Sequence, residues 1–148
     1  MQKRIGQDAR MVHVAYAMTD KQGTYSKYIG ASMCSLFART EVWVTVHLLH
    51  DETLTEKNRE YFIALTRKFG QQILFYNMAE LCADILQAAR DIFKAAVDTA
   101  YYTPAALYRI LAPKVLPAEV QRLIYLDADT IVNMDIRKLW EVFLMDIP

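Results

Sequence analysis

The sequence predicts an α/β fold with a mainly parallel sheet flanked by helices. Short apolar runs rich in strand-forming residues alternate with longer segments whose apolar residues recur at helical spacing. This alternation of strand and helix is typical of parallel sheets, whose crossover helices pack against the sheet. With 148 residues, 54% of them hydrophobic, the chain is expected to form one domain with a substantial core.

Four short apolar segments are the predicted strands of that sheet. They are Met11–Met18, Val42–Leu49, Gln72–Asn77 and Arg122–Asp127. The second is rich in β-branched residues, which is typical of a strand buried on both faces. Parallel sheets bind ligands beyond the carboxyl ends of their strands, so the segments that follow these strands are where a site is expected.

Helical patterns occupy the segments between and after the strands. In Tyr25–Ala38, the stripe at helical spacing consists of Tyr28, Ile29, Ser32, Met33 and Leu36. Further helices are expected from Ala79 to about Val97, at Thr103–Leu111 and at about Ile136–Phe143.

The helix expected at Glu56–Phe69 has signals at both ends. Thr53 and Glu56 have the spacing of a capping box, in which a threonine hydroxyl accepts a hydrogen bond from the first turn. Gly70 is the expected stop, because glycine readily adopts the left-handed conformation that ends helices.

Charge and cysteine content narrow the function classes. Lys+Arg and Asp+Glu both number 17, and this balance gives no electrostatic reason to expect a nucleic-acid partner. Cys34 and Cys82 form no CxxC motif and are expected as buried thiols of a reduced, intracellular protein. The polar N-terminus lacks a signal-peptide core, and no apolar run approaches a membrane span. We therefore expect a cytoplasmic protein, soluble or peripheral to the inner face of the membrane.

The segment "LIYLDADTIV" places two aspartates, Asp127 and Asp129, at the end of the fourth predicted strand. Two carboxylates one residue apart can be aimed at one cation, and carboxylates suit Mg²⁺ or Mn²⁺, which often share their ligand shell with substrate phosphates. The alternative is that one aspartate caps the following helix and the other is merely exposed. The other segment expected at this edge of the sheet is the loop Thr19–Thr24.

Other chemistries have weaker support in the sequence. Asp127–Thr130 also fits the DxDxT signature of haloacid-dehalogenase-like phosphatases, but that signature normally opens its domain and here four strands precede it. His47 and His50 lack further zinc ligands, so structural histidines are favoured. The glycines form neither GxGxxG nor a P-loop.

Five segments taken together resemble glycosyltransferase family 8, whose members include lipopolysaccharide galactosyl- and glucosyltransferases and glycogenin. In order they are "HVAYAMTD", "TYSKYIGASMCSLF", "VTVHLLHDETLTEKNREYF", "ALYRILAPKVLP" and "RLIYLDADTIVNMDIRKLW". The last, with its DxD and the downstream "DIRKLW", is the most specific. The resemblance implies a GT-A nucleotide-sugar-binding fold and retaining transfer of a hexose from a UDP-sugar to a glycan, lipopolysaccharide or protein.

The resemblance also implies roles for individual residues at the metal end of the donor. Asp127 and Asp129 match the carboxylates that hold Mn²⁺ (or Mg²⁺) against the donor diphosphate, and Ala128 matches a position near the ribose. Arg109 matches an arginine near the donor; the alternative is that it pairs with a local carboxylate.

At the base end, Ala17 and Thr19 match positions that meet the uracil edge, and Tyr25 matches a tyrosine that stacks on uracil. Asp20 is a further expected uridine contact. The alternatives are that Tyr25 is an ordinary aromatic at a helix start and that Asp20 is a capping residue. The chain departs from the family in "TDKQGTY", which holds extra residues and has Thr24 where an asparagine is usual.

Relatives continue well past the DxD. Residues 1–148 are therefore expected to be the N-terminal nucleotide-sugar-binding part of a GT-A domain, with the acceptor-binding half absent. The alternative is a non-catalytic nucleotide-sugar-binding fragment or remnant. Without the later segments we expect some apolar residues to lose cover and the chain to self-associate; they are Ile131, Val132, Leu139, Trp140 and Phe143.

Overall fold

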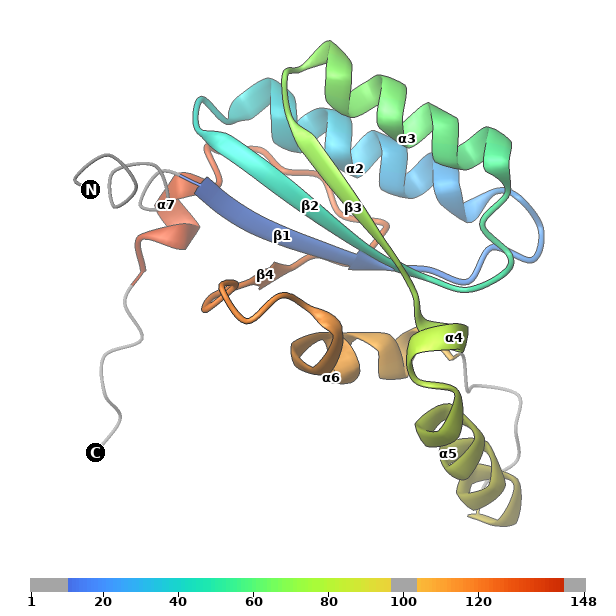
Figure 1. Ribbon diagram of the computed structural model, residues 1–148. Helices are drawn as coiled ribbons and strands as arrows, with labels where there is room; N and C mark the ends of the chain where they lie inside the picture. The colour runs from blue at the N-terminus through green and yellow to red at the C-terminus, as the bar shows by residue number, and fades with distance from the viewer. Residues whose placement is uncertain (1–10, 97–103, 143–148) are drawn as a thin grey trace, which may run out of the picture.

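The computed structural model describes residues 11–96 and 104–142, and its centre is a four-stranded parallel sheet with the order β3-β2-β1-β4 (Figure 1). The strands are β1 (Met11–Ala17), β2 (Trp43–His50), β3 (Gln72–Asn77) and β4 (Ile124–Tyr125). All three neighbouring pairs are parallel. The predicted α/β class and the existence of all four strands are confirmed.

The strand order reverses at β1. The chain passes from β1 to β2 to β3 in one direction across the sheet and then returns to the other side of β1 to form β4. In open parallel sheets, such a reversal leaves a crevice at the carboxyl ends of the two strands concerned. The loop after β1 and the DxD after β4 therefore meet at the same edge.

Helices cover both faces of the sheet (Figure 1). One face is covered by α2 (Tyr25–Arg39) and α3 (Glu56–Lys68), and the other by α6 (Ala105–Val115). The chain after β3 forms α4 (Met78–Leu81) and then α5 (Ala83–Ala96), which points away from the sheet. The last helix, α7 (Arg137–Trp140), lies beside the start of β1.

Alternation along the strands produces two apolar clusters, one on each face. Val12, Val14 and Tyr16 of β1 are buried in the cluster beneath α2 and α3. Ala17 and the β2 residue Leu49 join the other cluster, which is completed by α4, α5 and α6. Of the predicted stripe on α2, Tyr28 is exposed whereas the other four members are buried.

Several predicted boundaries need correction. The fourth strand is only two residues long and pairs with β1 alone, although Leu126 N still donates to the Ala15 carbonyl (3.0 Å). The helix expected from Ala79 is interrupted at Cys82, where the backbone leaves helical geometry as this side chain is buried beneath the sheet. The helix expected to end at Leu111 continues to Val115.

Two further expectations about single residues were wrong. The N-cap of α3 is Thr55, whose hydroxyl accepts from Asn58 N (3.2 Å), because the Thr53 side chain is bonded to Asp51 instead. Cys34 lies on the exposed side of α2, while Cys82 is buried as expected. The predicted stop of α3 is confirmed: Gly70 has φ +65° and donates to the Arg67 carbonyl.

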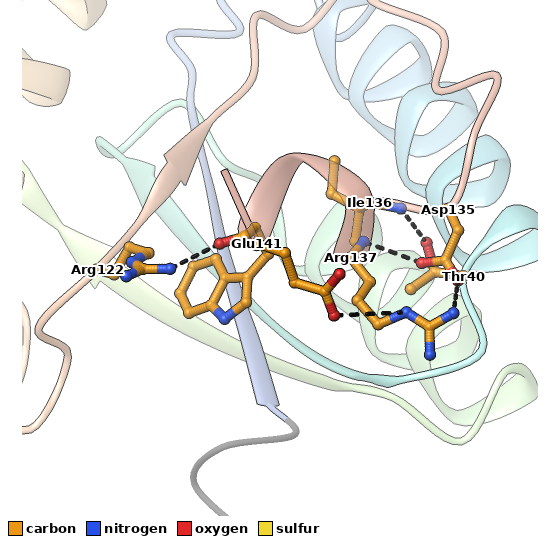
Figure 2. Close-up of polar contacts among 7 residues, drawn as sticks. Thr40, Arg122, Asp135, Ile136, Arg137 and Glu141 are labelled. Carbon is orange, nitrogen blue, oxygen red and sulfur yellow. Dashed lines mark hydrogen bonds and ion pairs between the residues drawn. The ribbon is translucent and has the colours of Figure 1, made fainter. Parts of the chain in front are cut away.

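The chain after the DxD follows α2 and is held there by hydroxyl groups. Ser35 Oγ accepts from Val132 N (2.9 Å), and Thr40 Oγ1 accepts from Ile136 N (3.4 Å). Figure 2 shows Arg137 between Asp135 and Glu141, with ion-pair distances of 3.3 and 4.0 Å.

Arg122, just before β4, secures the end of α7 (Figure 2). It donates to the Trp140 carbonyl (2.6 Å) and lies over the Trp140 ring. Of the apolar residues expected to lose cover, Ile131 and Leu139 are exposed, Val132 is buried and Trp140 is partly buried. Phe143 lies outside the described residues, as do Val97 and Thr103. Self-association stays a prediction.

Candidate functional site

The two aspartates of the DxD are exposed at the carboxyl end of β4, whereas Ala128 between them is buried. Among the side chains that the structure describes, in residues 11–92 and 104–142, none donates a hydrogen bond to either carboxylate or forms an ion pair with it, and neither carboxylate caps a helix. Their oxygen lone pairs are therefore free for a ligand from solution.

The backbone that carries these aspartates is held rigidly. Thr130 donates to the Asp127 carbonyl through its hydroxyl (2.7 Å) and its amide (3.2 Å). The Thr130 hydroxyl is also bonded to that of Ser32 on α2 (3.1 Å), which is bonded to the buried Tyr16 hydroxyl on β1 (2.9 Å). The motif is thereby tied to both the helix and the central strand, while its carboxylates point into solvent.

Four of the predicted donor-binding residues lie near one another at this edge, namely Tyr25, Arg109, Asp127 and Asp129. Burial raises the pKa of Tyr25, and the nearby charges of Asp129 and Asp127 raise it further, so this phenol lies close to the DxD. Burial likewise raises the pKa of Tyr125, with Asp127 adding to the effect and the Arg109 cation opposing it. Arg109 is exposed and forms no ion pair in the described part of the chain.

Tyr125 was not selected from the sequence. It lies within the fourth predicted strand, where an aromatic residue is most simply a core residue, and it does pack against the cluster that contains Ala17. Its electrostatic contact with Asp127, Arg109 and Tyr25 depends on how β4 and α6 pack, which no sequence motif reveals.

Asp20 caps the helix that carries Tyr25. Its Oδ1 accepts from Tyr25 N (2.8 Å), and its Oδ2 accepts from the amide (3.0 Å) and hydroxyl (2.5 Å) of Ser26. Burial alone would raise the pKa of Asp20, but these hydrogen bonds outweigh it and lower the pKa. Asp20 is only 4% exposed, and both its oxygens are engaged by the protein. Its expected contact with uridine stays a prediction.

Asp51 is a second buried carboxylate at this edge, and it belongs to no recognisable sequence motif. Its Oδ2 accepts from the hydroxyls of Thr19 (2.7 Å) and Tyr108 (3.1 Å). Its Oδ1 accepts from the amide (3.0 Å) and hydroxyl of Thr53, and Thr53 Oγ1 in turn accepts from Asp20 N (2.6 Å). The one signal available in the sequence was its place directly after β2.

A hollow of about 310 Å³ opens between the loop after β1 and the start of α6. It is lined by Thr19, Asp20, Lys21, Gln22, Thr24, Tyr25, Pro104 and Ala105. This size is at the lower end of small-molecule sites. A larger hollow, about 560 Å³, lies at the opposite end of the strands and is lined by none of the predicted site residues. We therefore associate the predicted site with the smaller one.

The histidines have structural contacts. His47 is hydrogen-bonded to His13 (2.9 Å) and to the Tyr76 hydroxyl (2.9 Å), and burial together with the neighbouring His13 lowers the pKa of His47 to about 4. His50 Nδ1 donates to the Asp51 carbonyl (2.9 Å).

The carboxylates of Asp127 and Asp129 are suited to a hard divalent cation, but they supply only part of its ligand shell. The described residues contain no group of three or more histidine, cysteine or acidic side chains able to hold a metal. Asp127 and Asp129 offer two free carboxylates, and Mg²⁺-like ions are commonly bound by one or two carboxylates together with substrate phosphates and water.

Comparison with known proteins gives a family match over most of the chain. A model of Glycosyl transferase family 8 matches residues 13–146. General stress protein A of Bacillus subtilis (strain 168) is 28% identical over 134 residues, which are 89% of this chain and 42% of that protein. This family match favours the glycosyltransferase interpretation over the phosphatase one.

Solved glycosyltransferase structures share the GT-A fold. Mouse xyloside xylosyltransferase 1, in its apo form, superposes with a TM-score of 0.62 at 22% identity, covering 88% of this chain and 47% of that one. Galactosyltransferase LgtC, in complex with donor and acceptor sugar analogues, gives 0.60 at 19% identity, covering 91% and 44%. The chain thus spans less than half the length of each of these relatives. No helix in the described residues is long and apolar enough to cross a membrane.

Proposed function

The chain belongs to glycosyl transferase family 8, and we propose that it supplies the binding site for a UDP-sugar donor together with a divalent cation. The observation that carries this proposal is the pair of exposed carboxylates at the end of β4, which have no partner among the described residues. Free carboxylates beside a strand-order reversal are suited to a cation that accompanies a ligand in the crevice. LgtC, which shares the fold, has been crystallised with donor and acceptor sugar analogues.

Each remaining site residue has a role that matches its chemistry. The Tyr25 ring, 40% exposed, offers a face for uracil, with Ala17 and Thr19 near the edge of the base. Asp127 and Asp129 would hold Mn²⁺ or Mg²⁺ for the donor diphosphate, and Ala128 would lie near the ribose. Arg109 supplies positive charge to the phosphates. A bound divalent cation supplies Lewis-acid stabilisation of the leaving diphosphate.

For the whole protein, we propose transfer of a hexose from the UDP-sugar to a glycan, lipopolysaccharide or protein acceptor, with retention of anomeric configuration. The alternative is that this chain binds the nucleotide-sugar without transferring it. Because the chain spans less than half the length of these relatives, donor binding and sugar transfer should be measured separately. Release of free sugar from radiolabelled donor distinguishes them.

Calorimetry tests the donor site directly. UDP is expected to bind more tightly with Mn²⁺ than with excess EDTA, and Asp129→Asn should remove most of that difference, on the order of 2–5 kcal/mol. Asp84→Asn, at an exposed aspartate in the first turn of α5, is the matched control and should keep the difference. Equal UDP affinity with and without the metal would refute the proposed site.

A further inference from the structure

Asp51 joins three segments that meet at the carboxyl edge of the sheet. It follows β2, and its carboxylate accepts hydrogen bonds from Thr19 after β1 and from Tyr108 on α6. Through Thr53 it is also linked to the backbone of Asp20, the residue that caps α2. Asp51 has no part in the donor contacts proposed above.

The segments that Asp51 joins are the two walls of the 310 Å³ hollow. Thr19, Asp20 and Tyr25 belong to the wall formed after β1, and Pro104 and Ala105 at the start of α6 form the other. Since Tyr108 lies one turn farther along α6 from Ala105, its bond to Asp51 fixes that helix against the first wall.

The geometry of this connection depends on a charged acceptor. Asp51 is 6% exposed and forms no ion pair within the described residues, so its burial is compensated by neutral donors alone. Burial would raise the pKa of Asp51, but hydrogen bonds from Thr53, Thr19 and Tyr108 lower it, and the carboxylate stays ionised at neutral pH. An ionised carboxylate can accept from all these donors at once, whereas an amide at this position brings donors of its own.

We propose that Asp51 is a positioning residue for the nucleoside end of the donor. It holds the loop after β1 and the start of α6 at the separation that a base requires, without touching the donor itself. This inference rests on the proposed function, because it takes the hollow to be the place where the base binds. The metal end of the site is anchored separately, through Thr130, Ser32 and Tyr16.

The separation of the two anchors gives a selective test. Calorimetry in Mn²⁺ is carried out with UDP and with inorganic pyrophosphate, which lacks the nucleoside. Asp51→Asn is expected to weaken UDP binding about tenfold, as for the loss of one net hydrogen bond, and to leave pyrophosphate binding unchanged. Glu52→Gln, at the adjacent exposed carboxylate, is the matched control and should change neither.

Tyr108→Phe provides a second variant that keeps the buried ring and removes only the hydroxyl that reaches Asp51. It should weaken UDP binding selectively but less than Asp51→Asn, and it should add little to Asp51→Asn in the double variant, because the bond is already lost there. Tyr61→Phe, at an exposed tyrosine of α3, is its control.

The outcomes separate this inference from the proposed function. If the wild-type chain binds UDP no more tightly than pyrophosphate, the proposed base site fails, and the inference fails with it. If the wild-type chain prefers UDP and both variants keep that preference in full, only the role of Asp51 is overturned. Equal losses for UDP and pyrophosphate would also overturn it, since they indicate general loss of structure.

Discussion

Two pairs of aspartates lie at the same edge of the sheet in opposite environments. Asp20 and Asp51 are buried, and both oxygens of each accept hydrogen bonds from nearby amides and hydroxyls. Asp127 and Asp129 are exposed, and no described residue donates to either carboxylate. The four residues are chemically alike, and they differ only in what surrounds them.

This difference separates the aspartates that stabilise the fold from those available to bind a ligand. A buried carboxylate is tolerated only when its lone pairs are satisfied, and satisfied lone pairs are no longer available to a metal. Asp20 and Asp51 therefore stabilise the segments that form the walls of the 310 Å³ hollow. Asp127 and Asp129 remain available to a cation because their rigidity comes from backbone contacts made by Thr130 rather than from the carboxylates themselves.

The largest effect on stability is expected at the buried pair. Asp51→Asn should lower the free energy of unfolding by about 3 kcal/mol, because hydrogen bonds to a buried charge are lost and donors are left facing each other. Urea denaturation followed by circular dichroism measures the change. A loss below about 0.5 kcal/mol is typical of surface substitutions. Such a result would show that Asp51 contributes no more to stability than an exposed aspartate and would contradict the distinction between the two pairs.

The buried histidine His47 is expected to make the stability of the fold depend on pH. The folded protein keeps His47 neutral down to a pKa of about 4, while an unfolded histidine binds a proton below about pH 6.5. Protonation therefore favours the unfolded state, and stability should fall by about 2 kcal/mol as the pH drops from 7 to 5. His13 and Tyr76 are the titratable groups bonded to it.

Urea midpoints at pH 7, 6 and 5 measure this dependence. His47→Gln, which does not titrate, should flatten the profile over that range even if the variant is less stable overall. The lowered pKa values of Asp20 and Asp51 affect stability only at more acidic pH, so they do not interfere. An unchanged slope in His47→Gln would show that another group is responsible.

A ligand-facing aromatic should affect binding without affecting the fold. Tyr25→Ala is expected to weaken UDP binding by roughly 1–3 kcal/mol, the scale of base–aromatic stacking. Because the ring is 40% exposed, the unfolding free energy should change little. Tyr61→Ala on α3 is the control, and a crystal complex with uracil far from Tyr25 would contradict the assignment.

The fold was largely predictable because its signals are local. The predicted strand Val42–Leu49 could be recognised by its β-branched residues, and Gly70 marks the end of α3. The break at Cys82 was missed because the composition stays helical across it and only packing beneath the sheet interrupts the helix. The threonine pair before α3 was misread because both Thr53 and Thr55 can cap, and the hydrogen bond to Asp51 decides between them.

The site was predictable only where a motif stands beside a strand. Asp127 and Asp129 could be placed because the DxD ends an apolar run. Asp51 and Tyr108 could not, because a single aspartate and a single tyrosine 57 positions apart have no shared pattern until α6 packs against β2.

The distinction between the two pairs is tested most directly by a single set of variants, measured twice. Asp20→Asn, Asp51→Asn, Asp127→Asn and Asp129→Asn are each characterised for free energy of unfolding and for affinity toward Mn²⁺ with pyrophosphate. We predict a crossed result: the first two lose stability and keep metal–pyrophosphate binding, whereas the last two keep stability and lose that binding. Variants of Asp127 and Asp129 that bind metal and pyrophosphate as the wild-type chain does would contradict the account.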